Sequence, residues 1–139
     1  MENEAVSNTG PILHLSEINL VKALDIFAKI FIPDEVANEI RKKKIAVPKK
    51  VKILSLTGEN KDTVKILTNE HNLDIGEAEA IALTIEKKAR CFLTDDLDAR
   101  QTAKEFGIEV HGTVGIILRA FREKIIDKKL AIEKIKELK

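Results

Sequence analysis

Short apolar runs alternate along the chain with longer segments of helical spacing. The runs at residues 30–32, 51–56 and 91–94 have the length and composition of strands, and shorter candidates lie at 4–7 and 109–110. Between them, apolar residues recur every three or four positions, as they do on one face of a helix. This alternation predicts an α/β domain with a mainly parallel central sheet.

The expected helices begin and end at residues that suit those positions. Pro33 fits the first turn of a helix, and Gly107 fits the residue after one. The expected helices cover residues 11–18, 20–28, 34–43, 61–70, 75–88, 96–106, 112–123 and 128–138. The helix at 75–88 has apolar spacing that predicts a buried stripe of Ile75, Ala78, Ala82, Ile85 and Ala89. No repeat or linker divides the chain, so we expect one domain over residues 1–139.

The composition of the chain limits the class of protein and the cellular compartment that we expect. With 139 residues, 44% of them hydrophobic, the chain is expected to bury a core of its own. The formal net charge of +1 indicates no particular partner, although residues 41–52 carry a basic stretch that is able to guide an RNA backbone. The single cysteine, Cys91, fits a reducing compartment. With no membrane-spanning run and no signal-peptide pattern, the expected location is the cytoplasm.

Carboxylates gather where the predicted strands end. Asp95 and Asp96 directly follow the run at 91–94, and Asn8 follows the first strand. Ligands of such sheets bind at the carboxyl ends of the strands, so these side chains are candidates for one site. Glu39 and either Glu77 or Glu79 lie on helices that neighbour these strands. Clustered carboxylates repel each other, and a divalent cation removes that repulsion.

The ligand type indicates which cation. Oxygen-only ligands suit Mg²⁺ or Mn²⁺, and the three histidines show no zinc spacing. His14, on an apolar segment, is expected to be packed rather than catalytic. No P-loop, dinucleotide motif or nucleophile elbow is present. A two-aspartate phosphoacceptor domain is disfavoured, because its paired acids would follow the first strand, where this chain has Asn8.

Several of these acids also have structural interpretations. Asp95 or Asp96 is suited to cap the following helix, and Asp98 fits that helix's first turn. Glu39 is spaced to pair with Lys43.

Glu77 and Glu79 require a separate comparison. Asp74 and Glu77 have the spacing of a capping box. Glu77 and Glu79 lie on opposite flanks of the predicted stripe and do not both point at one site; periodicity does not choose between them.

Four pieces of the sequence, in order, resemble the PIN-domain family, in its compact prokaryotic toxin-like form. They are VSNTGPILHL, IPDEVANEI, GEAEAIAL and FLTDDLDARQTAKEFGIEVHGTVGIILRA, and the resemblance spans residues 6–126. The last piece is the most specific, because its acids, alanine, arginine and later Gly-Thr occur together at the right spacing. The resemblance implies a three-layer α/β/α sandwich in which an acid cluster binds Mg²⁺ or Mn²⁺ and RNA is cleaved.

Position by position, the resemblance selects a set of site residues. It favours Glu77 over Glu79, and it places Asn8 where many PIN domains have an aspartate. The expected function is therefore a metal-dependent endoribonuclease, with a non-catalytic PIN scaffold that binds RNA or protein as the alternative. A homodimer and an antitoxin protein are the partners that the resemblance implies. The predicted catalytic and metal-binding residues are Asn8, Glu39, Glu77, Asp95 and Asp96, with Asp98 as a further metal ligand.

Overall fold

The sheet is built from five short strands that all run in the same direction. The computed structural model describes residues 3–138. Within them the strands pair in the order β3-β2-β1-β4-β5, and every pairing is parallel. The strands are β1 (Glu4–Ser7), β2 (Lys29–Ile32), β3 (Val51–Ile53), β4 (Cys91–Leu93) and β5 (Glu109–His111).

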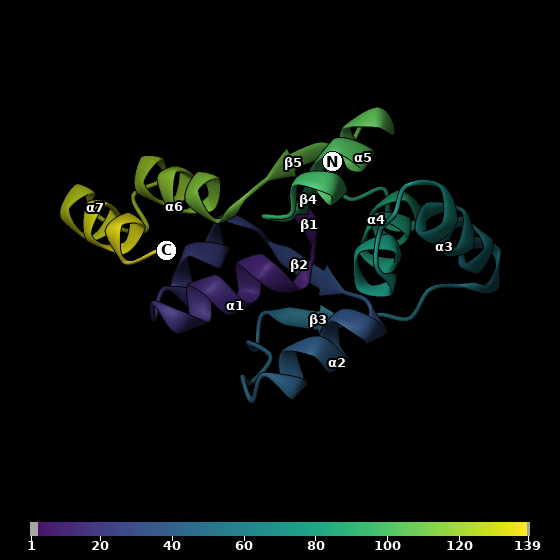
Figure 1. Cartoon of the computed structure of the whole chain (residues 1–139). Helices are drawn as coiled ribbons and strands as arrows, with labels where there is room; N and C mark the ends of the chain where they lie inside the picture. Colours follow the sequence, from purple (N-terminus) through teal and green to yellow (C-terminus); the bar gives the residue numbers. More distant parts are fainter. Residues whose placement is uncertain (1–2, 139) are drawn as a thin grey trace.

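Helices cover both faces of this sheet. Figure 1 shows α3 and α4 on one side, and α1, α6 and α7 on the other. The arrangement is the three-layer α/β/α sandwich that the family resemblance implied, built on the parallel sheet that the alternating pattern predicted. None of the helices of residues 3–138 is long and apolar enough to cross a membrane. The helices are α1 (Thr9–Glu17), the 3₁₀ helix η1 (Val21–Ile26), α2 (Asp34–Lys42), α3 (Gly58–Glu70), α4 (Ile75–Lys87), α5 (Leu97–Glu105), α6 (Thr113–Arg122) and α7 (Lys128–Glu137).

The two central strands set the position of the site. Strands β1 and β4 are neighbours, with Val6 opposite Phe92 and Ser7 opposite Leu93, and all four side chains are buried. From β1 the chain continues to β2 on one side, whereas β4 lies on the other side and leads outward to β5. The carboxyl ends of β1 and β4 therefore form the topological switch point, where ligands of such sheets bind.

Two expected details differ in the structure. Residues 20–28 were expected to be an α-helix but contain only the 3₁₀ helix η1, which still buries Leu24. The stripe predicted for α4 is wrong at two of its positions, because Ile75 is 56% exposed and Ile85 is 38% exposed. Helix α4 contacts the sheet, α2, α3 and α5, so its covered surface is broader than one stripe. Its buried residues are Gly76, Ala78, Ala80, Ile81, Ala82, Leu83 and Thr84.

Candidate active site

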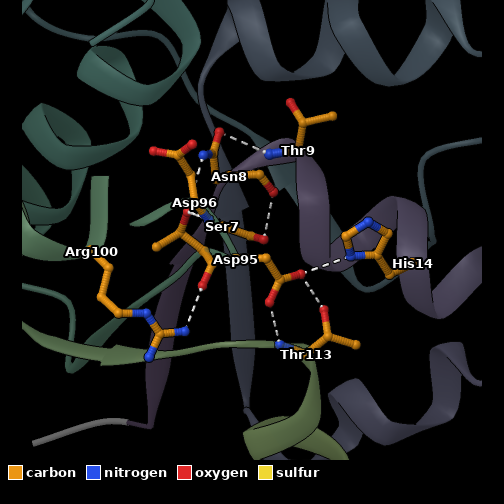
Figure 2. A network of polar contacts seen from close by, with 9 residues as sticks. Ser7, Asn8, Thr9, His14, Asp95, Asp96, Arg100 and Thr113 are labelled. Carbon is orange, nitrogen blue, oxygen red and sulfur yellow. Dashed lines mark hydrogen bonds and ion pairs between the residues drawn. The ribbon is translucent and has the colours of Figure 1, made fainter. Parts of the chain in front are cut away.

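Asn8 and Thr94 connect the ends of the two central strands. Asn8 is the N-cap of α1: its Oδ1 accepts the Thr9 N–H at 2.9 Å, and only 7% of the residue is exposed. Figure 2 shows the bond between Asn8 and the Thr9 N–H. The Asn8 amide donates to the Thr94 hydroxyl oxygen at 3.2 Å. The same oxygen accepts the Asp96 N–H at 3.1 Å. Asp96 is thereby fixed beside Asn8.

Asp96 and Glu77 bring two carboxyl groups together from different helices. Asp96 caps α5, with Oδ2 accepting the Ala99 N–H at 2.8 Å. Glu77 closes the predicted capping box of α4, with Oε1 accepting the Asp74 N–H at 3.0 Å. Burial raises the pKa of Glu77 to about 7; the Asp74 N–H opposes this, whereas the charges of Asp74 and Asp96 add to it. Glu77 and Asp96 are therefore close enough to interact directly.

Glu39 reaches the same region from α2. Its Oε1 accepts the Thr9 hydroxyl at 2.5 Å, so it is joined to the residue that follows Asn8. Its carboxyl group also lies against Gly76, where an added Cβ would stand 2.6 Å from Oε1. A side chain at position 76 would therefore displace the Glu39 carboxyl group from the first turn of α4, one residue before Glu77.

Glu39, Glu77 and Asp96, together with Asn8, are what we call the acid cluster, in which Glu39 lies against Gly76 and Glu77 interacts with Asp96. Ligand atoms of the three acids do not all lie within 4.8 Å of one another, so their side chains would have to move to share one cation. One oxygen of each carboxylate is fixed by the hydrogen bond described above. The second oxygens, Oε2 of the two glutamates and Oδ1 of Asp96, are not used by these bonds. Asn8 differs, because its carboxamide oxygen already caps α1 and its nitrogen bonds Thr94.

Asp95 points away from this cluster, although it is adjacent to Asp96 in sequence. Figure 2 shows its carboxylate directed at His14 and Thr113. Oδ2 accepts the Thr113 hydroxyl at 2.5 Å and lies 2.8 Å from His14 Nδ1, while Oδ1 accepts the Thr113 N–H at 2.7 Å. Asp95 therefore joins α1 to the start of α6. The adjacent aspartates each cap a helix, but not the same one. Asp98 is exposed in the first turn of α5.

Glu79 has a structural partner that the sequence did not reveal. Its Oε1 accepts the Glu35 N–H at 3.1 Å, at the start of α2, where the N-cap residue Pro33 supplies no side-chain acceptor. Burial raises the pKa of Glu79; the Glu35 N–H opposes this, and the charges of Asp34, Glu35 and Glu39 add to it. Glu77 and Glu79 thus contact different groups.

His14 also differs from its expected packing, because its side chain is 45% exposed and paired with Asp95. No spacing rule links residue 14 with residue 95. The only sequence signal for a role of Thr113 in the site was the Gly112-Thr113 pair within the fourth segment that resembles PIN domains.

The basic stretch at residues 41–52 lies away from the acid cluster. It follows the end of α2 and precedes β3, so it occupies the amino-terminal edge of the parallel sheet, whereas Asn8 and Asp96 follow strand carboxyl ends. Lys50 is paired there with Asp25 at 3.6 Å. Near the cluster, Arg100 donates to the Thr94 carbonyl at 3.2 Å rather than to an acid. Arg100, on α5, therefore brings a positive charge to the end of β4.

Comparison with known proteins agrees with this architecture. The family model DUF3368, described as a PIN domain, matches residues 4–139. A PilT N-terminus domain protein from the hyperthermophilic archaeon Sulfolobus solfataricus P2 has a similar structure, with a TM-score of 0.64 and 20% sequence identity over 84% of this chain and 92% of that one. None of the curated proteins matches the sequence. Since the family model spans nearly all of the sequence, the chain belongs to the PIN-domain family.

Proposed function

We propose that the protein is an endoribonuclease that depends on Mg²⁺ or Mn²⁺. The observation that supports this most directly is the convergence of Glu39, Glu77 and Asp96 from three helices onto the switch point of the sheet. PIN domains are generally nucleases, and the acid cluster lies where a parallel α/β sheet binds its ligand.

The acid cluster fits a divalent cation of this kind. All of its donors are oxygen atoms, which Mg²⁺ and Mn²⁺ prefer. Each carboxylate is oriented by a hydrogen bond from the Thr9 hydroxyl or a backbone N–H, and a cation would replace the direct contact between the Glu77 and Asp96 carboxyl groups. The raised pKa of Glu77 shows that negative charge is unfavourable there without a cation. When bound, the cation would neutralise charge on the phosphate and activate water for attack.

The residues of the chain then have separate roles. Glu39 and Asp96 would hold the cation through Oε2 and Oδ1. Glu77, whose pKa is raised to about 7, is suited to take the proton of the attacking water at Oε2. Asn8 and Thr94 keep the strand ends in register, and Arg100 supplies positive charge for a phosphate. Asp95 acts as a positioning residue, because it holds α1 and α6 at the rim of the site.

The alternative is a PIN scaffold that binds RNA or a partner protein without cleaving RNA. Asn8 is the observation that favours it. Its carboxamide is buried, adds no charge, and is used in structural hydrogen bonds at both ends. The cluster then has three carboxylates, and its affinity for a cation decides between the two functions. A homodimer and an antitoxin partner also remain proposals from the family resemblance.

The test is cleavage of a mixed RNA pool by the purified protein, with and without Mn²⁺ and with a chelator. Asp96→Asn retains a capping oxygen but removes the charge, and we expect a loss of activity of about 100-fold or more. Asp127→Asn is the matched control, because Asp127 caps α7 in the same way, accepting the Leu130 N–H at 2.8 Å. Cleavage that survives the chelator, or that is equal in Asp96→Asn and wild type, would refute the proposal.

A further inference from the structure

A second group of metal-ligand side chains lies on β4 and β5, toward the β5 edge of the sheet. Cys91 on β4 and Glu109 and His111 on β5 place one sulfur, one carboxylate oxygen and one imidazole nitrogen within 4.8 Å of one another. We call these three residues the β4–β5 cluster. None of them belongs to the acid cluster. The proposed nuclease mechanism does not use them.

The strand register explains why these three side chains meet. Cys91 is directly opposite Glu109, and Leu93 is opposite His111. Residues two apart on a strand project from the same face, so Glu109 and His111 flank the Cys91 side chain. His111 Nε2 lies 2.8 Å from Glu109 Oε2, so the two outer ligands are already in contact.

We propose that the β4–β5 cluster binds a thiophilic divalent cation of the Zn²⁺ type. Thiolate, imidazole and carboxylate are the protein ligands of Zn²⁺, and Mg²⁺ does not take the first two. Bond lengths of about 2.0–2.3 Å place neighbouring ligand atoms of a tetrahedral zinc site about 3.3–3.7 Å apart. The ligand atoms of the cluster lie within 4.8 Å of one another, and His111 Nε2 is 2.8 Å from Glu109 Oε2, so binding requires adjustments of about 1 Å, which side-chain rotations are able to supply.

Charge and access are consistent with this assignment. A thiolate and a carboxylate together balance the charge of a divalent cation, which matters because Cys91 is fully buried. Glu109 is exposed and His111 is partly exposed, so the cluster extends from the interior to the surface. His111 also lines a cavity of about 310 Å³ with Arg100 and Gly112, so one ligand of the cluster is accessible from this cavity.

The experiment uses Co²⁺ as a spectroscopic probe for Zn²⁺, with excess Mg²⁺ present to occupy oxygen-only sites. Co²⁺ bound by a thiolate gives a sulfur-to-metal charge-transfer absorption in the near ultraviolet, which a carboxylate site does not give. We expect the wild-type protein to develop this band with one equivalent of Co²⁺, and Zn²⁺ to displace it. Cys91→Ala should abolish the band. His111→Gln and Glu109→Gln should each weaken Co²⁺ binding by about tenfold or more.

Two controls separate this site from others. His71→Gln changes another histidine paired with an acid, 3.7 Å from Glu105, and should leave the Co²⁺ titration unchanged. Asp96→Asn should also keep the band, which separates this result from that of the acid cluster. If Cys91→Ala does not fold, the two β5 variants decide. The absence of a band in the wild type, or a band of equal affinity in both β5 variants, would overturn the proposal.

Discussion

Replacing Glu77 with glutamine is expected to stabilise the metal-free protein at alkaline pH. Burial raises the pKa of Glu77 to about 7 from its ordinary 4.5, so the folded protein binds a proton that the unfolded chain releases. The contribution of Glu77 to the free energy of unfolding is therefore fully present below pH 4.5 and is lost as the pH rises through about 7. Glutamine retains an oxygen for the Asp74 N–H and never carries the charge.

The size of the effect follows from the two pKa values. The span from 4.5 to about 7 corresponds to about 3.4 kcal/mol, at about 1.36 kcal/mol for each pH unit. Glu77 is only partly buried, so water and salt screen a share of this, and we expect about 2 kcal/mol at pH 8.5. At pH 4.5, where Glu77 is protonated in the folded protein, the difference should vanish.

The assay is urea unfolding at a series of pH values with a chelator present. Glu86→Gln is the control on the same helix. Although burial alone would raise it, the pKa of Glu86 is lowered by hydrogen bonds from Thr57 and Asn60, so this variant should lose stability at neutral pH. If Glu77→Gln is no more stable than wild type at pH 8.5, or if the difference is independent of pH, the charge on Glu77 is not the cause.

Three further predictions test the site and the assembly. Asn8→Asp retains the oxygen that caps Thr9 N–H but adds a negative charge, so calorimetry should show tighter Mn²⁺ binding. With a chelator present, the same variant should be less stable than wild type. No change in either quantity would place residue 8 outside the metal site. Gly76→Ala should weaken Mn²⁺ binding, because its Cβ would displace the Glu39 carboxyl group, while the helix-propensity gain of about 1 kcal/mol maintains stability; unchanged Mn²⁺ affinity would contradict this. Light scattering should show a homodimer that Phe121→Asp, on the exposed face of α6, dissociates, and a monomeric wild type would refute it.

Sequence patterns predicted the local structure well, because each strand and helix has its own apolar periodicity and end signals. The capping box of Asp74 and Glu77 is an example, since its spacing alone specifies its hydrogen bonds. Ile117 shows the limit: its neighbours Val114, Leu118 and Phe121 on α6 are exposed, yet Ile117 is fully buried. The spacing of apolar residues does not say how many neighbours will cover a helix.

The sequence did not predict the direction in which each side chain of the site points. Asp95 and Asp96 are equivalent to a sequence rule, but the α6 N-terminus draws one of them away from the cluster. That helix follows β5, so its position depends on the whole sheet order. The contact of Glu79 with the start of α2 also depends on the tertiary arrangement. So does the pairing of Cys91 with Glu109, which are 18 positions apart in sequence but directly opposite each other in the sheet. Strand order is a tertiary property that no local pattern encodes.

The edges of the sheet carry a consequence for how copies of this protein associate. Strands β3 and β5 form the two edges, and each has only three residues. Exposed Lys52 lies at the centre of β3, and exposed Glu109 begins β5. A neighbouring strand would have to desolvate these charges along a very short ladder, so the edges resist extension by another chain. Self-assembly is therefore directed to helical surfaces, and growth into an extended intermolecular sheet is disfavoured.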